Sequence, residues 1–263
     1  MKYYSSINYA YDQQCQNIEY FENSSDETIA EGTVYWDCNG QGCDSRTLQP
    51  WDSTKYKSSP VYAPIKPSEL GVTDSEYNLW MTGAFSKDMS QLIGPDDGCC
   101  GIGDNGGCGK CISVTIDDPN LVSNPSWKVL VMQKNVCPPW TQGCKYGMKH
   151  VDFAVPGHDD LSYSTSNICG KQNMTYLTQE DSGKCIDQNH NPVQGCECNF
   201  NFYNDDNVPE ASKKLLVQGC KNFSEWGWKI GNPQFKFKVV DCPQAYKDYI
   251  HNGFTKDGPE IKK

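Results

Sequence analysis

The chain has 263 residues, of which 37% are hydrophobic and 15 are cysteine, and its formal net charge is −10. This length suits one large domain or two small ones and is sufficient to bury a core. The acidic balance, without a run of Lys or Arg, argues against a nucleic-acid or anionic-membrane partner. No apolar stretch reaches transmembrane length, and no signal peptide opens the chain, so we expect a mature or trimmed form.

The cysteine content is the most informative feature of the composition. Such a density is typical of secreted proteins that fold in an oxidising compartment. Three glycosylation sequons, at Asn23, Asn173 and Asn222, agree with secretion. Because the cysteine count is odd, at least one thiol is free or pairs with another chain, and the connectivity cannot be read from one sequence.

The chain divides into an extension, one domain and a tail. Residues 1–31 are polar and rich in tyrosine, and they are either a loosely ordered tail or an arm pinned to the domain through Cys15. Residues 32–245 carry the alternating segments of the domain, and residues 246–263 form a charged C-terminal tail.

The first predicted strand is Gly32–Cys38, which is rich in strand-forming side chains. Alternation places Thr33, Tyr35 and Asp37 on one face. An Asp at a strand end is also common in ordinary turns, so this position alone does not identify a site. Further segments with strand or helix patterns are residues 79–85 (a core strand or a short helix), 112–116, 127–133 and 234–240 (strands), and 209–217 (a helix).

The glycine-rich segment 98–111 contains Gly101-x-Gly103-x-x-Gly106, the spacing of a dinucleotide-binding fingerprint. That fingerprint needs a strand before it and a helix after it, whereas turn residues precede this segment and a predicted strand follows it. The four cysteines of the segment could bind zinc. In an oxidised chain, disulfides are the better interpretation.

The loop 134–149 is rich in proline and contains Trp140 between two cysteines. An aromatic ring in a stapled loop could stack on a sugar ring or could simply pack the loop. This loop contains no Asp or Glu, whereas the segment that follows it, residues 150–157, contains one Asp.

Residues 150–157 form a short apolar segment with one carboxylate in its middle. Read as a strand, Val151, Phe153 and Val155 face one way, and His150, Asp152 and Ala154 face the other. Apolar surroundings disfavour the ionised form of a carboxyl group, and a carboxyl that keeps its proton is a candidate general acid. The alternative is an Asp that caps a turn at the rim of a sheet.

Short strands at uneven spacing, joined by long disulfide-stapled loops, predict an all-β protein with a closed barrel and one or two short helices. At this point the motifs resemble those of glycoside hydrolase family 45. The resemblance rests on Tyr35-Trp36-Asp37-Cys38, on His150-x-Asp152-Phe153 ending in Pro156-Gly157, and on Trp228, Phe235-x-Phe237 and Cys242-Pro243, and it covers residues 32–245.

This resemblance implies a six-stranded double-psi β-barrel that hydrolyses internal β-1,4 bonds of cellulose or related glucans with inversion. It implies Asp37 as the general base and Asp152 as the general acid, a pair that would leave room for a water molecule. The substrate contacts that we predict come from Thr33, Tyr35, Trp36, Trp140 and His150. We expect no cofactor, no metal, a β-glucan partner, neither nucleic acid nor membrane as a partner, and a secreted monomer in which the odd cysteine could still link two chains.

Two other functions fit the same barrel. An expansin-like protein would bind glucan and loosen walls without hydrolysis, but such proteins typically lack the base and carry a second domain. A structural, disulfide-rich extracellular protein would use the fold without chemistry. The presence of Asp37 favours the hydrolase.

Overall fold

The computed structural model describes residues 28–36, 43, 60–94, 96, 106–139, 144, 147–158, 185–187, 191–198 and 210–252. Two of the predicted site residues, Asp37 and Trp140, lie outside these ranges. The predicted N-terminal extension is outside them up to residue 27, and so is Cys15.

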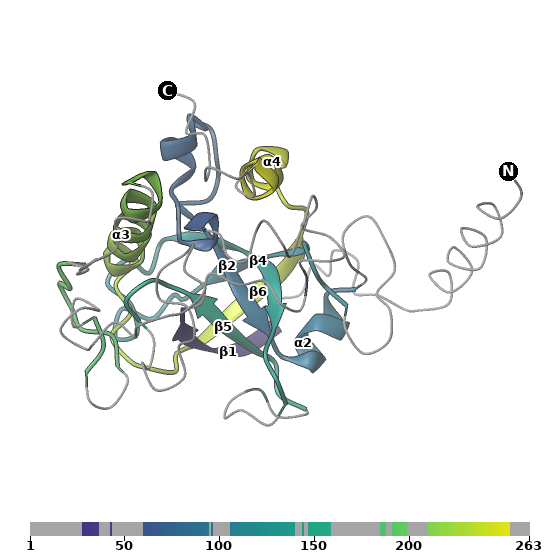
Figure 1. Ribbon diagram of the computed structural model, residues 1–263. Coiled ribbons are helices and arrows are strands. Elements are labelled where there is room, and N and C mark those ends of the chain that lie inside the picture. The colour runs from purple at the N-terminus through teal and green to yellow at the C-terminus, as the bar shows by residue number, and fades with distance from the viewer. Residues whose placement is uncertain are drawn as a thin grey trace, which may run out of the picture.

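Six strands form one closed barrel in the order β1-β5-β2-β4-β3-β6 (Figure 1). The strands are β1 (Thr28–Tyr35), β2 (Leu79–Phe85), β3 (Cys111–Thr115), β4 (Lys128–Val136), β5 (His150–Ala154) and β6 (Gln234–Val240). This confirms the predicted six-stranded barrel and resolves the segment 79–85 as a strand. It also confirms that a strand follows the glycine-rich segment, where a dinucleotide fingerprint would need a helix.

The barrel contains two parallel pairs, β1 with β5 and β2 with β4, and all its other neighbours are antiparallel. The connection from β1 to β2 therefore passes the position of β5, and the connection from β4 to β5 passes the position of β2. These two crossing connections are the feature that gives the double-psi barrel its name. They bring β1 and β5, which are far apart in the sequence, side by side.

Alternating side chains fill the barrel, as the period of two predicts. Val151 and Phe153 of β5 point inward and join one apolar cluster with residues of the other strands. A Cβ atom at Gly32 would lie 2.8 Å from ring atoms of both Phe153 and Trp228, so β1 needs a glycine to approach them. Because successive side chains of a strand point to opposite faces, His150 and Asp152 lie on the outer face of β5.

The helices lie outside the barrel (Figure 1). They are α2 (Lys87–Leu92), α3 (Glu210–Trp226) and α4 (Gln244–Asn252), with two 3-10 turns, η1 (Pro60–Tyr62) and η2 (Pro67–Leu70). The predicted helix at 209–217 is confirmed and continues to Trp226. None of the described helices is both long and apolar enough to cross a bilayer.

Both ends of the barrel domain extend beyond the boundaries drawn from the sequence. β1 begins at Thr28, because residues 28–31 pair with β6 and Ala30 is buried. Helix α4 begins at Gln244 and continues into the range 246–263 assigned to the C-terminal tail, and its residues Tyr246 and Ile250 are fully buried. The ring of Tyr246 lies 5.0 Å from that of Trp80, so α4 is packed on the barrel.

Five disulfides join described cysteines, and they confirm the expectation of a disulfide-stapled fold. The pairs are Cys43–Cys108, Cys111–Cys242, Cys137–Cys144, Cys185–Cys196 and Cys198–Cys220. Cys108 and Cys111, for which the sequence left zinc as an alternative, are thus disulfide-bonded. The other cysteines, Cys15, Cys38, Cys99, Cys100 and Cys169, lie outside the described residues.

One of the three glycosylation sequons is buried in the fold. Asn222 lies in α3 with 1% of its surface exposed. Its Nδ2 atom donates hydrogen bonds to the carbonyl oxygen of Pro64 at 3.2 Å and to Glu69 at 2.9 Å. An amide nitrogen used in this way is not an acceptor for a glycan in the folded protein. Asn23 and Asn173 lie outside the described residues.

Candidate functional site

Asp152 lies on the outer face of β5, in a row of paired residues that crosses three neighbouring strands. It pairs with Thr33 of β1 on one side and with Ala84 of β2 on the other. Its sequence neighbours Val151 and Phe153 belong to the barrel core, so alternation turns the carboxyl group away from the core. The side chain of Asp152 keeps 24% of its surface exposed. The barrel therefore fixes this carboxyl group and leaves part of it accessible to a ligand.

His150 lies two residues before Asp152 on the same face, and its side chain is 2% exposed. Its Nε2 atom is 2.8 Å from Oγ1 of Thr33, which is a hydrogen-bond distance, and 3.6 Å from Oδ1 of Asp152, which is longer than one. The Nδ1 atom is buried without a hydrogen-bond partner among the described residues. Thr33 thus holds the imidazole so that Nε2 faces the carboxyl group.

The disulfide Cys137–Cys144 lies beside the other carboxyl oxygen. Sγ of Cys137 is 3.5 Å from Oδ2 of Asp152. A disulfide sulfur carries no proton, so this contact excludes water without donating a hydrogen bond. Ala84 and the partly buried Tyr35 pack against the same disulfide. The two oxygens of Asp152 therefore have different surroundings, an imidazole on one side and sulfur on the other.

Trp36 differs from the substrate contact predicted for it. The residue is 1% exposed and packs in the cluster between the barrel and its outer layer. A ring buried in this way has no free face on which a sugar could stack. The described part of the structure gives Trp36 a packing role at the end of β1.

Sequence reasoning missed two residues of this region. Ala84 is the small neighbour of Asp152 on β2, and a lone alanine in an apolar strand gives no signal. Lys134 of β4 is fully buried, and its Nζ atom lies over the rings of Tyr35, Trp36 and Tyr62. The only signal in the sequence is a lysine that follows the buried run 129–133 without a break.

Asp37, the second predicted carboxyl group, and Trp140 lie outside the described residues. The distance between Asp37 and Asp152 and the sugar contact of Trp140 stay predictions. Among the predicted residues that are described, the structure brings together Thr33, Tyr35, His150 and Asp152.

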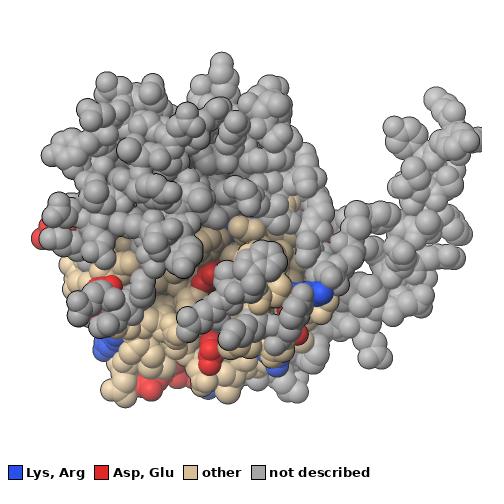
Figure 2. Space-filling model, turned by 60° about the horizontal axis from the view of Figure 1, so that its bottom comes forward, with Lys and Arg blue, Asp and Glu red and all other residues tan. Residues whose placement is uncertain are grey.

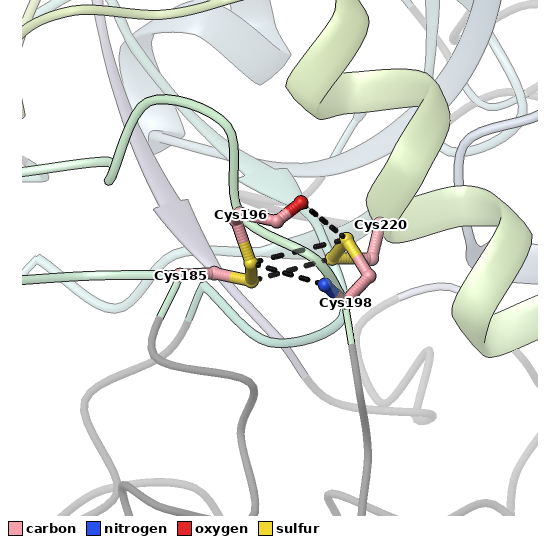
Figure 3. A group of neighbouring side chains, drawn as sticks. All are labelled: Cys185, Cys196, Cys198 and Cys220. Atoms are coloured by element: carbon pink, nitrogen blue, oxygen red, sulfur yellow. Dashed lines mark hydrogen bonds between the residues drawn. A yellow bond between two sulfur atoms is a disulfide. The ribbon is translucent and has the colours of Figure 1, made fainter.

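Four further cysteines, Cys185, Cys196, Cys198 and Cys220, converge in a second cluster (Figure 3). The four sulfur atoms lie within 4.8 Å of one another, which is close enough for a shared metal ion. They are joined as Cys185–Cys196 and Cys198–Cys220, so none of them is a thiolate ligand. The cluster joins two loop segments to α3.

The described surface carries charges of both signs. Figure 2 shows acidic and basic side chains dispersed over one face, without a basic cluster among the described residues visible there. The described basic residues include several that are paired, such as Lys236 with Asp117 at 2.7 Å.

No family model matches the chain, and no curated protein matches it. Among solved structures, the chain is similar to the crystal structure of a cellulase from the Antarctic springtail Cryptopygus antarcticus. The match covers 85% of this chain and 95% of that chain, with 14% sequence identity and a TM-score of 0.43. At this level of similarity the match assigns neither an activity nor a catalytic residue to this chain.

Proposed function

We propose that the protein is a secreted inverting endo-β-1,4-glucanase in which Asp152 is the general acid and Asp37 is the general base. The observation that carries this proposal is the arrangement of Thr33, His150 and Asp152 on neighbouring strands. A partly exposed carboxyl group with an imidazole at 3.6 Å and sulfur at 3.5 Å is a group positioned for proton transfer.

The reaction assigns a separate task to each carboxyl group. Asp152 donates its proton to the glycosidic oxygen as the bond to the anomeric carbon breaks. Asp37 removes a proton from the water that attacks the opposite face of the sugar. In an inverting enzyme the two carboxyl groups are about 6.5–9.5 Å apart, so that this water fits between base and sugar.

His150 was predicted as a substrate contact, but its side chain is only 2% exposed. In this proposal it therefore acts on Asp152 and not on the substrate. The hydroxyl of Thr33 fixes the ring, and the ring in turn limits the orientations of the carboxyl group. Tyr35, which is only partly buried, is the described aromatic that is best placed to contact a sugar.

Neutral glucan agrees with the net charge of −10, since a neutral polymer needs no basic surface. Secretion agrees with the five disulfides of the described residues, because such bonds persist in oxidising compartments.

The test is release of reducing sugar from carboxymethylcellulose or lichenan by the wild type, Asp37→Asn and Asp152→Asn. Loss of a general acid or base lowers kcat by about 10²- to 10⁴-fold, and we expect a loss of this size for each variant. The control is Asp74→Asn, which changes an exposed aspartate and should leave the rate unchanged. Nuclear magnetic resonance of the first product should detect the α-anomer.

Three results would contradict the proposal. Full activity of both variants would remove the catalytic assignment, and a β-anomer as first product would exclude inversion. Retention of the wild type on cellulose without any hydrolysis would favour the glucan-binding alternative.

A further inference from the structure

A lysine is unusual at a buried position of a barrel strand, and Lys134 of β4 is such a residue. The register between β2 and β4 shifts at this point, since Gly83 pairs with Gln133 and Ala84 pairs with Asn135. Lys134 therefore stands at the irregularity in the register between β2 and β4. Bulges re-aim side chains and occur often next to active sites. The residue is 0% exposed, although lysine is rarely buried completely.

Three aromatic rings surround the ammonium group of Lys134. Its Nζ atom is 4.5 Å from the ring centroid of Tyr62, 5.1 Å from that of Tyr35 and 5.6 Å from that of Trp36. All three distances lie within the range of a cation–π contact. We call Tyr35, Trp36 and Tyr62 the aromatic cage. Through it, one charge links the end of β1, the turn η1 and β4.

The cage adjoins the candidate site. Tyr35 stands on the same face of β1 as Thr33, which holds His150. Tyr35 pairs with Ala154, and Thr33 pairs with Asp152. Trp36 is the last described residue before the chain continues to Asp37. A group that fixes Tyr35 and Trp36 therefore fixes the end of β1 from which the proposed base follows.

We propose that Lys134 is a positioning residue of this site, whose caged ammonium group holds the end of β1 in the arrangement that the reaction requires. The inference rests on the proposed function and adds a residue to it. Lys134 need not touch the substrate, because it acts through Tyr35 and Trp36.

If Lys134 had a purely structural role, a different result would be expected. Replacement of a buried charged group by an apolar side chain of similar volume is often neutral or stabilising. Lys134→Met keeps an unbranched side chain of similar volume and removes the charge. If Lys134 only fills space, this variant keeps both its melting temperature and its kcat.

If Lys134 positions β1, Lys134→Met lowers kcat by about 10- to 100-fold with KM nearly unchanged, because a small misplacement of catalytic groups is costly. Lys134→Arg keeps a charge that contacts aromatic rings and should recover part of the rate. The matched control is Lys128→Met on the same strand, where the lysine is exposed and pairs with Glu76 at the surface. It should retain full kcat.

A second pair of variants tests the cage if Lys134→Met fails to fold. Tyr62→Phe keeps the ring nearest to the ammonium group, whereas Tyr62→Leu removes it. We expect Phe to keep the rate and Leu to lower kcat. Equal rates for the two variants, or a Lys134→Met enzyme with kcat within about twofold of wild type, would overturn the role of Lys134.

The two proposals fail in different ways. A wild type without any activity on glucans overturns the proposed function. Near-ultraviolet circular dichroism of Lys134→Met then still reports on the cage, because the packing of Tyr35, Trp36 and Tyr62 contributes to the signal. An unchanged spectrum in a folded variant would show that the ammonium group holds none of these rings.

Discussion

His158, in the turn after β5, is a buried histidine whose ionisation opposes folding. Its ring is 2% exposed, donates from Nδ1 to the carbonyl oxygen of Pro156 at 3.2 Å, and meets the ring of Phe223 edge-on. Burial lowers the pKa of His158 from 6.5 to about 4, because the imidazolium would lose its hydration. The neutral ring is therefore the form that fits the fold.

The pH dependence of stability follows from this pKa. Between pH 6.5 and 4 the unfolded chain binds a proton at His158 that the folded chain does not. Above pH 6.5, protonation of His158 does not reduce the free energy of unfolding. As the pH falls from 6.5 towards 4, this free energy decreases by about 3 kcal/mol in total. Urea unfolding at pH values from 7 to 4 should show this decline in the wild type and a flatter profile in His158→Gln. Parallel profiles for the two proteins would contradict it.

At the scale of elements, helix α3 packs so closely on the chain near η1 that one position has no room for a side chain. A Cβ atom at Gly219 would lie 2.6 Å from Cβ of Ala63 and 3.0 Å from Cδ of Pro64. This close approach, and not backbone conformation, is the reason for a glycine in the middle of a helix.

Gly219→Ala should therefore destabilise the protein, although alanine is the better helix former by about 1 kcal/mol. Overpacking of a tight contact costs about 1–3 kcal/mol, and we expect this cost to prevail. Thermal unfolding measures the difference, with Lys221→Ala at an exposed position of α3 as the control that should be nearly neutral. A stabilised Gly219→Ala protein would show that α3 can move away from Ala63.

The elements were predictable where alternation is clear. Residues 234–240 alternate apolar and polar side chains, and β6 covers this range. The second half of α3 was not predicted, because Gly219 and Asn222 interrupt its apolar pattern, and both are explained only by contacts with residues near 64. Helix α4 was missed for the same reason, since the partner of Tyr246 is Trp80.

The candidate site was predictable in part on the same physical grounds. Alternation places His150 and Asp152 opposite the core residues Val151 and Phe153, and the structure agrees. Lys134 was not predictable, because the sequence pattern places it at the start of the loop 134–149, whereas β4 continues to Val136. The cage exists only after distant segments meet.

At the scale of the whole molecule, the disulfides differ in the length of the chain segment that each of them closes into a loop. Cys111–Cys242 joins residues separated by 131 positions, whereas Cys137–Cys144 closes a loop with a separation of 7. In the chain-entropy description, the long loop contributes about 5 kcal/mol and the short one about 2 kcal/mol. The closure of the barrel thus depends more on the first bond.

We expect the double variant Cys111→Ala/Cys242→Ala to lose more stability than Cys137→Ala/Cys144→Ala. Thermal unfolding of both variants under non-reducing conditions gives the ranking. The short disulfide lies against Asp152. We therefore expect its removal to show mainly as a lower rate of glucan hydrolysis and less as a lower melting temperature. The reverse ranking of the two melting temperatures would contradict the entropic account.

The pairing of β1 with β5 and β6 has a consequence for how this protein is made. A ribosome releases β1 first, yet the hydrogen-bond partners of Thr28 to Glu31 lie in residues 234–237, near the end of the described chain. Both edges of β1 stay open until β5 is made, and the edge that pairs with β6 stays open until residues 234–237 follow, so β1 is exposed to wrong pairing during this time. Cys111 likewise emerges long before Cys242, and any cysteine that appears in between competes for its sulfur. The yield of correctly oxidised protein should therefore depend on a disulfide isomerase more than on the final stability of the barrel.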